Sequence, residues 1–373
     1  MPKVLISAST LSHLQRFHLP YLKYFRDRGF EVHAAIPGQE APEYAQILHT
    51  IPMEKSLLSP RNLRAVFLLR GILRKERFDL ILTHTALAGS VVRLALFLAG
   101  KGNTKTVHTV HGYLFWKGCG GLNTLRYRLP ERMLRGVTDC LITMNGEDAA
   151  AARSLVRKGG LLFQVPGMGA DEDRFRPVSQ DARRTAREAL SLPETAYVLV
   201  YAAEFSRRKN HIELLRAMEQ IVREAPQTVL LLCGQGDTLA EMHGEAARLG
   251  IEEAVRFLGF RDRMEEIYPA CDIAVSSSIS EGLPFNVIEA QLCGLPVAAS
   301  RIRGHTDLIL DGENGRLYRP GESGALARIV LEILQSPDRG ANLGRRALET
   351  VPAFTLKPAF RANTAAYEAA LRL

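Results

Sequence analysis

Two glutamates eight residues apart, Glu281 and Glu289, are the side chains whose type and spacing most clearly suggest chemistry. Residues 276–281 are small and polar and follow an apolar run, which predicts a loop after a strand. Pro284 suits the first turn of a helix, which we expect over residues 285–293. Backbone N–H groups at a helix start bind anions, and carboxylates accept hydrogen bonds from hydroxyl groups. The layout therefore suits a sugar nucleotide, with the diphosphate at the helix start and hydroxyls on the acids.

A second group that could do chemistry is the basic loop that contains Arg207, Arg208 and Lys209. It follows the apolar run 198–201, and loops at the carboxyl ends of parallel strands are where such sheets bind ligands. These cations could neutralise a diphosphate, both when it binds and when it leaves. Positive groups directed at charge that develops in a transition state contribute roughly 3–4 kcal/mol each.

The elements that must position these residues are short apolar strands that alternate with helical stretches along the whole chain. Such alternation predicts parallel sheets covered by helices on both faces. The predicted strands fall into two sets, Val4–Ile6, Val32–Ile36, Leu80–Leu82, Val107–Val110 and Leu141–Thr143, then Val198–Tyr201, Val229–Leu232, Val255–Leu258, Ile273–Val275 and Val297–Ala299. Two sets predict two doubly wound α/β domains, separated near the Pro- and Gly-rich stretch 164–169.

Composition is that of a globular protein, with 46% hydrophobic and 24% charged residues among 373. The start of the chain lacks the plan of a signal peptide, and five scattered cysteines without CxxC spacing favour a reducing cytoplasm. Residues 1–165 hold 23 Lys and Arg against 11 Asp and Glu, a net charge of +12, whereas the remainder has 25 against 29, a net of −4. A basic half predicts an anionic partner. Because no nucleic-acid-binding pattern is present, we expect a phosphorylated lipid or an anionic membrane surface.

The stretch 281–290, followed by Gly-Leu-Pro-Val-Ala at 294–298, resembles the signature of glycosyltransferase family 4. The resemblance implies the GT-B fold: two Rossmann-like domains that face a cleft, with a last helix that crosses back to the N-terminal domain. The domains would be 1–165 with 357–373, which receives the acceptor, and 166–356, which binds the donor. In the family, the first Glu contacts the donor sugar and the second holds the ribose, and these roles fall on Glu281 and Glu289.

The resemblance extends over nearly the whole chain and implies further roles. His111, at the end of a predicted strand, resembles the cleft histidine that hydrogen-bonds the donor sugar, and Lys209 matches the family's lysine. Glu204 stands where the family usually has an arginine, so that role would move to Arg207 or Arg208. We therefore assign catalytic roles to Glu281, His111 and Lys209. The expected donor-binding residues are Glu289, Arg207, Arg208, Gly282, Leu283, Pro284, Phe285, Asn286, Gly234, Gly236, Phe260 and Arg261.

The segment 9–20 lacks the GxGxxG of a dehydrogenase and resembles bacterial capsule and exopolysaccharide glycosyltransferases. It places Ser12, His13 and His18, together with Tyr113, on the acceptor side. His108 lies earlier in its strand and is interpreted as a core or cleft-wall residue. The acidic run 171–173 looks like a metal-binding DxD but matches the family's interdomain connector, so we expect no essential metal and no cofactor.

A helical stripe formed by Leu122, Leu125, Leu129, Met133 and Val137 accompanies several arginines and follows the only tryptophan of the chain. Pro130 interrupts it, so a helix should begin or kink there. A basic amphipathic segment suits contact with an anionic membrane, and packing on the protein's own sheet is the alternative.

The expected function is a retaining, metal-independent transfer of a sugar from a nucleoside-diphosphate sugar, taken as a UDP-sugar, to a polyprenyl-diphosphate-linked saccharide. The transferred group would be a hexose or N-acetylhexosamine. The enzyme would act in cell-surface polysaccharide assembly as a peripheral protein at the inner face of the cytoplasmic membrane, by analogy. Two alternatives stay open: a sugar-nucleotide epimerase of the same fold, and a non-catalytic sugar-nucleotide-binding protein.

Overall fold

The computed structural model describes residues 1–54 and 59–373, which divide into two compact units. The N-terminal unit comprises Met1–Gly169 together with Leu356–Leu373, and the C-terminal unit comprises Ala170–Thr355. The first division therefore falls after residue 169 rather than after residue 165.

The N-terminal unit is built on a parallel sheet of seven strands in the order β3-β2-β1-β4-β5-β6-β7. The strands are β1 (Lys3–Ser7), β2 (Glu31–Ile36), β3 (Ile47–Thr50), β4 (Leu80–His84), β5 (Lys105–Thr109), β6 (Cys140–Thr143) and β7 (Leu161–Gln164). The five central strands match the predicted apolar runs. The two edge strands, β3 and β7, are partly buried and were absent from the sequence prediction.

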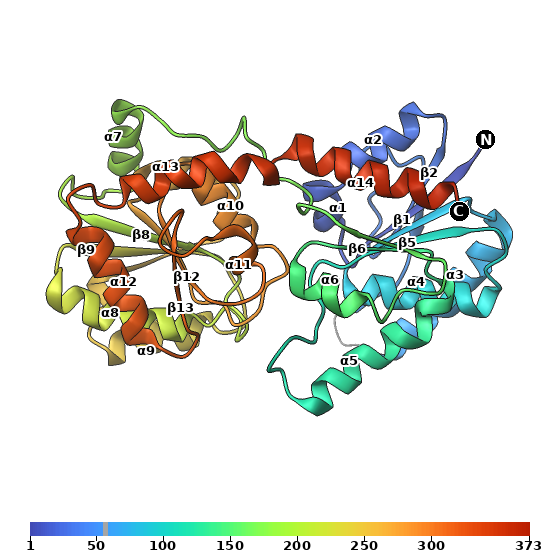
Figure 1. Ribbon diagram of the computed structural model, residues 1–373, viewed down its shortest axis with the longest axis horizontal. Helices are drawn as coiled ribbons and strands as arrows, with labels where there is room; N and C mark the ends of the chain where they lie inside the picture. Colours follow the sequence, from blue (N-terminus) through green and yellow to red (C-terminus); the bar gives the residue numbers. More distant parts are fainter. Residues whose placement is uncertain (55–58) are drawn as a thin grey trace. The chain divides into compact units, whose positions relative to one another are not determined.

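Helices cover both faces of this sheet (Figure 1). They are α1 (Leu11–Phe17), α2 (Leu19–Asp27), α3 (Pro60–Glu76), α4 (Ala86–Ala99), α5 (Gly121–Leu134), α6 (Gly146–Ala152) and the C-terminal α14 (Leu356–Leu371). The helices α3, α4 and α5 pack on one face, whereas α2 and α14 lie on the other. The ring of Tyr367 on α14 lies 5.8 Å from Tyr21 and 5.9 Å from Phe25, which fixes α14 to α2. The predicted return of the last helix to the N-terminal domain is thus confirmed.

The C-terminal unit has a second parallel sheet, of six strands in the order β10-β9-β8-β11-β12-β13. The strands are β8 (Tyr197–Ala202), β9 (Thr228–Cys233), β10 (Val255–Gly259), β11 (Ile273–Ser276), β12 (Val297–Ser300) and β13 (Arg316–Tyr318). Buried side chains of the helices α8 and α12 form the core on one face, and α10 and α13 cover the other (Figure 1).

The helices of this unit are α7 (Gln180–Ala189), α8 (His211–Glu224), α9 (Leu239–Arg248), α10 (Phe285–Leu292), α11 (His305–Leu308), α12 (Ser323–Gln335) and α13 (Ala341–Thr350). Short 3-10 turns complete the chain at Arg135–Val137, Glu252–Ala254, Met264–Glu266, Tyr268–Ala270 and Val351–Phe354. Helix α10 ends one residue before the predicted position, because Cys293 serves as its C-cap.

The strand order of each sheet reverses direction once, between β1 and β4 in the N-terminal unit and between β8 and β11 in the C-terminal unit. Such reversal points open a crevice at the carboxyl ends of the strands, where doubly wound sheets bind ligands. The fold prediction of two Rossmann-like units is confirmed. Among the described helices, none is both long and apolar enough to cross a membrane.

The sequence prediction for α5 is wrong in one respect. The helix does not start at Pro130 but continues through it, and the expected kink there stays a prediction. Most of the expected apolar stripe on α5 faces solvent, since Leu122, Leu125 and Met133 are 87%, 60% and 70% exposed. These three side chains therefore do not pack on the sheet of their own unit, whereas Val137, the last residue of the stripe, is buried in its core.

Candidate functional site

The centre of the C-terminal site is the carboxylate of Glu281, which two cations hold from the neighbouring loop. Lys209 Nζ donates to Glu281 Oε1 at 2.5 Å, and Arg208 Nη1 donates to Oε2 at 2.9 Å. The hydroxyl of Ser278 also donates to Oε1, at 2.6 Å. Glu281 and Lys209 are largely buried, with 8% and 13% of their side chains exposed, whereas Arg208 is 45% exposed.

This arrangement keeps Glu281 ionised. Burial alone would raise the pKa of this carboxyl, but the charges of Lys209 and Arg208 and the hydrogen bond from Ser278 lower it to about 2. At neutral pH, Glu281 is therefore an anion that accepts hydrogen bonds and has no proton to donate.

Backbone and hydroxyl contacts fix the two loops that carry this group. Tyr201, at the end of β8, donates its buried hydroxyl to Lys209 O at 3.0 Å and lies 2.8 Å from Ser278 Oγ. Ser277 Oγ donates to Asn210 O at 2.9 Å. The loops that follow β8 and β11 are thus joined at the reversal point of the sheet, which explains how residues 72 positions apart meet.

The start of α10 adjoins this group. Its N-cap is Pro284, in extended conformation, and no side chain caps the helix within the described chain. Glu289 lies in the second turn, where the Tyr268 hydroxyl donates to its Oε2 at 3.3 Å. The other predicted residues of the segment, Gly282 through Asn286, are buried or half-buried. The structure therefore brings Glu281, at the start of this segment, together with Lys209 and Arg208.

The two glycines after β9 have a structural role that the sequence prediction missed. A Cβ atom on Gly234 would lie 1.9 Å from Ala203 O, and one on Gly236 would lie 2.3 Å from Phe205 O. The close approach that requires glycine here is therefore to the backbone of the β8–α8 loop. The predicted approach to a nucleotide stays a prediction.

Other predicted donor residues surround this edge of the sheet. Phe260 and Arg261 directly follow β10, and Gly234 N donates to Gly259 O at 2.8 Å, which aligns the ends of β9 and β10. Arg207 is exposed and forms no ion pair with any residue that the structure describes. Of the two candidate arginines, Arg208 is the one that reaches Glu281.

Sequence reasoning missed the loop after β12. Its Arg303 is buried and donates to Ser280 Oγ at 3.1 Å. His305 is fully buried and contacts Ser276 Oγ through Nε2 at 3.0 Å, and burial lowers its pKa to about 4. The signal that could have found this loop is its position directly after the apolar run 297–299. The same kind of position identified the loop at 207–209.

The predicted residues of the N-terminal unit gather at its own reversal point. His13 lies on α1 and His18 caps its end, while His111 follows β5. His84, which the sequence analysis did not single out, ends β4 and places Nδ1 3.2 Å from His111 Nε2. Burial lowers the pKa of His13 to about 4, and burial and the adjacent imidazoles hold the pKa of the other three well below its usual value. The four rings are therefore neutral at physiological pH.

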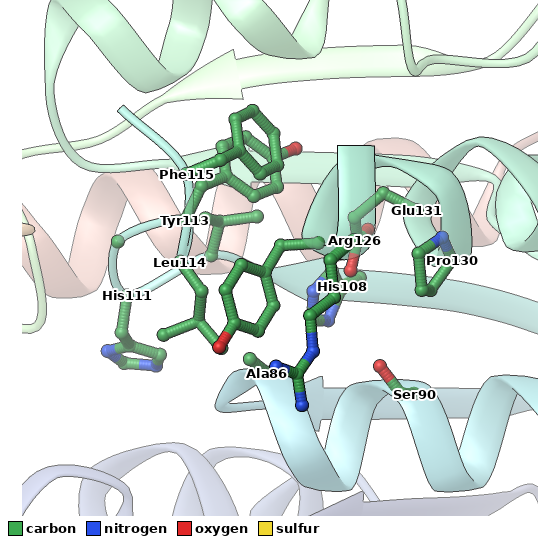
Figure 2. A pocket seen from close by; sticks show the side chains of 13 residues that line it. Ala86, Ser90, His108, His111, Tyr113, Leu114, Phe115, Arg126, Pro130 and Glu131 are labelled. Carbon is green, nitrogen blue, oxygen red and sulfur yellow. The ribbon is translucent and has the colours of Figure 1, made fainter. Parts of the chain in front are cut away.

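Tyr113 and Ser12 are neighbours of the histidine cluster in sequence, Ser12 next to His13 on α1 and Tyr113 two residues after His111. Ser12 is exposed and its hydroxyl is 3.2 Å from Thr10 Oγ1. Tyr113 is buried, stacks on Phe115 with ring centroids 4.6 Å apart, and lines a cavity of about 280 Å³. Figure 2 shows His111 at one side of this cavity and Glu131 at the other.

His108 is a core residue, as predicted. It contacts Thr83 Oγ1 at 2.9 Å and packs against Gly89. The acidic run at 171–173 forms a turn, in which Asp171 Oδ1 accepts hydrogen bonds from the backbone N–H groups of Asp173 and Arg174. The main-chain role of Asp171 agrees with the connector interpretation.

Two doubly wound units, one of which presents a cation–carboxylate group at its reversal point, define a GT-B glycosyltransferase architecture. Two family signatures match the chain: Glycosyltransferase Family 4 over residues 21–157, and Glycosyl transferases group 1 over residues 182–350. The chain belongs to these family 4 glycosyltransferases.

Individual relatives agree with this assignment. EpsD of Bacillus subtilis (strain 168), named as a glycosyltransferase, is 36% identical over 95% of this chain and 93% of its own length. The UDP-Gal:alpha-D-GlcNAc-diphosphoundecaprenol alpha-1,3-galactosyltransferase of Escherichia coli is 26% identical over 69% of this chain and 66% of its own. The crystal structure of Anabaena HepE in complex with UDP and glucose has a TM-score of 0.80, with 22% identity and full coverage of both chains, which supports the fold.

Proposed function

We propose that this glycosyltransferase moves a hexose or N-acetylhexosamine from a UDP-sugar to a polyprenyl-diphosphate-linked saccharide, with retention of configuration and without a metal ion at the diphosphate. The observation that carries the proposal is the contact of Lys209 and Arg208 with Glu281 beside the start of α10. This one edge of the sheet combines positive charge, a helix N-terminus and an ionised carboxylate.

The cations would act on the leaving group. When the bond between the anomeric carbon and the diphosphate oxygen breaks, the electron pair stays on the diphosphate. Lys209 and Arg208, with the start of α10, would stabilise that charge, at roughly 3–4 kcal/mol for each directed donor. A divalent ion serves the same purpose in other phosphate sites, so two fixed cations make one unnecessary here.

The charge state of Glu281 restricts its role. Because its pKa is about 2, the carboxylate would not protonate the leaving group. It would accept hydrogen bonds from the sugar and stabilise positive charge on the anomeric carbon, while Glu289 would bind the ribose and His111 would orient the sugar. The acceptor hydroxyl would attack the face that the diphosphate leaves, and its proton would pass to the departing phosphate oxygen.

A lipid-linked acceptor is supported by the surface of the N-terminal unit. The helices α3, α4 and α5, which lie side by side, expose large apolar side chains. They are Leu63, Phe67, Leu68, Leu94, Phe97, Leu98, Leu122, Leu125, Leu129 and Met133. The half of the sequence that contains them carries the net charge of +12. An apolar and basic surface suits peripheral contact with an anionic bilayer, here the inner face of the cytoplasmic membrane.

The named relatives support the same substrate classes. The E. coli relative is named for a UDP-linked donor and a diphosphoundecaprenol-linked acceptor. The role in exopolysaccharide assembly rests on the resemblance of segment 9–20 to capsule and exopolysaccharide glycosyltransferases.

The test is a panel of UDP- and GDP-sugars, incubated with and without a polyprenyl-linked saccharide extract and without added Mg²⁺ or Mn²⁺. We expect nucleoside diphosphate release from one donor that depends on the lipid, and an anomeric configuration in the product that matches the donor. Glu281→Gln should abolish release, whereas Glu219→Gln, at an acid whose side chain is 41% exposed on α8, should not.

Other outcomes would contradict the proposal. Release that ignores the lipid and yields free sugar or an isomerised donor would indicate an epimerase or hydrolase. Dependence on added Mg²⁺ or Mn²⁺ would exclude the metal-independent mechanism, and an inverted product would exclude retention.

A further inference from the structure

Four histidines, His13, His18, His84 and His111, form a cluster in the N-terminal unit, with neighbouring rings in contact. It joins three elements, since α1 supplies His13 and its C-cap His18, β4 supplies His84, and the loop after β5 supplies His111. All three meet at the reversal between β1 and β4, where the crevice of this sheet is expected.

The ring nitrogens lie close enough together to share one ion. His13, His18 and His111 each offer one nitrogen, and these atoms all lie within 4.8 Å of one another. His84 Nδ1 is 3.2 Å from His111 Nε2, and the rings of His84 and His18 have centroids 3.8 Å apart. In a tetrahedral zinc site with bonds of about 2.0–2.1 Å, ligand nitrogens are about 3.3 Å apart. To reach that geometry, the most distant pair of these nitrogens would have to close by up to about 1.5 Å.

Several of these nitrogens have no other use. His18 is fully buried, and neither of its ring nitrogens has a hydrogen-bond partner among the residues that the structure describes. The same holds, within those residues, for the buried Nε2 of His13. Buried polar atoms are nearly always paired, so unpaired imidazole nitrogens in a group whose ligand atoms lie within 4.8 Å of one another leave a position for a shared ligand.

We propose that this cluster binds one zinc-class ion, with His13, His18 and His111 as ligands and His84 as the fourth. Four imidazoles without a carboxylate suit Zn²⁺ or a neighbouring first-row metal and do not suit Mg²⁺ or Ca²⁺, which prefer oxygen ligands. A second group of possible ligands, Glu31, His33 and Glu76, does not qualify. The ammonium group of Lys3 already contacts both of its acids, at 3.3 and 2.7 Å.

The ion would fix α1 to the ends of β4 and β5. Coordination through Nε2 of His111 would also place the ring proton on Nδ1, which sets the tautomer that this histidine presents to a substrate. The proposed metal site belongs to the N-terminal unit. It shares no residue with the proposed diphosphate-binding site at Lys209 and Arg208. Its test needs neither donor nor acceptor, so it can succeed or fail independently of the proposed function.

The experiment uses the full chain, free of any affinity tag, stripped with a chelator and dialysed. Calorimetric titration with Zn²⁺ should give about one ion per chain, and Co²⁺ should give the visible absorption bands of a tetrahedral nitrogen site. At a hundredfold excess of Zn²⁺ over its Kd, Tm should rise by about 5–10 °C.

His13→Ala and His111→Ala should each weaken Zn²⁺ binding by about 100-fold or more and remove the Co²⁺ bands. His49→Ala, at a half-buried histidine of the same sheet outside the cluster, is the matched control and should bind as the native chain does. His13 is itself only half-buried, so its replacement should leave the fold intact by circular dichroism. Absence of Zn²⁺ binding by the native chain, or equal loss in His49→Ala, would overturn the proposal.

Discussion

Replacement of Lys209 by methionine tests the central electrostatic argument, because it removes one charge and keeps most of the side-chain volume. In the native chain the ammonium group lies 2.5 Å from Glu281 Oε1 and is 13% exposed. The substitution therefore removes a cation that would face the leaving diphosphate. It also leaves Glu281 with Arg208 as its remaining cationic partner among the described residues.

Two magnitudes follow. Loss of one directed donor costs roughly 3–4 kcal/mol of transition-state stabilisation, which lowers kcat by about 10²- to 10³-fold. The pKa of Glu281, about 2 against an ordinary 4.5, corresponds to roughly 3 kcal/mol in favour of the ionised form. A carboxyl with a lowered pKa contributes stability above its unfolded pKa and loses that contribution as pH falls towards the folded pKa. In Lys209→Met the pKa of Glu281 should rise, so the acid loss of activity and of Tm should move to higher pH.

The assay measures initial rates of nucleoside diphosphate release and Tm from about pH 2 to pH 8, a range that includes both the ordinary and the lowered pKa of Glu281. Arg223→Met is the matched control, because this arginine of α8 is 72% exposed and pairs with Glu219 at 3.4 Å, outside the candidate site. Its kcat should stay within about threefold of the native value. The reasoning fails if Arg223→Met loses as much activity as Lys209→Met, or if the acid limb of Lys209→Met does not move.

Three further predictions concern packing and the membrane. Glu131→Ala breaks a bidentate ion pair with Arg93, whose side chain is 1% exposed. It should lower the free energy of unfolding, measured by urea denaturation, by about 3–5 kcal/mol. Gly234→Ala should destabilise the C-terminal unit by about 1–3 kcal/mol and weaken nucleotide binding in calorimetry. Gly244→Ala, at an open position within α9, should be neutral or slightly stabilising. Phe97→Ser should weaken binding to anionic vesicles in sedimentation by about tenfold, and Phe260→Ser should not.

The central strands were predictable because they are buried on both faces and read as continuous apolar runs. Every predicted strand is present, from β1 in the first sheet to β12 in the second. The missed strands β3, β7 and β13 are short and lie at sheet edges, where one side of the strand has no neighbour to demand apolar residues. Pro130 misled the prediction for α5 because local sequence alone does not show that the helix continues through a proline.

The candidate site was predictable in its residue types and less so in its contacts. Spacing and strand ends pointed to Glu281, Lys209 and His111, whereas His13 and His18 were expected from the resemblance to family 4 glycosyltransferases. The pairing of Lys209 with Glu281, and the arrival of His84 beside His111, depend on strand order. Strand order is a long-range property that no local pattern records, so these contacts required the structure.

The contact between the two cations and Glu281 does not exhaust their capacity to bind an anion. A carboxylate balances one of the two positive charges, which leaves a net charge of about +1 beside the start of α10. An ammonium group has three N–H donors and a guanidinium has five. Lys209 uses one on Glu281, and Arg208 directs Nη1 to Glu281 and Ser280. Glu281 therefore holds both cations in place, and Lys209 is largely buried there. The remaining N–H donors and the net positive charge of the two cations stay available for a diphosphate. Such preorganisation lowers the reorganisation required at the transition state, and it explains why an acid that donates no proton would still be indispensable to the transfer.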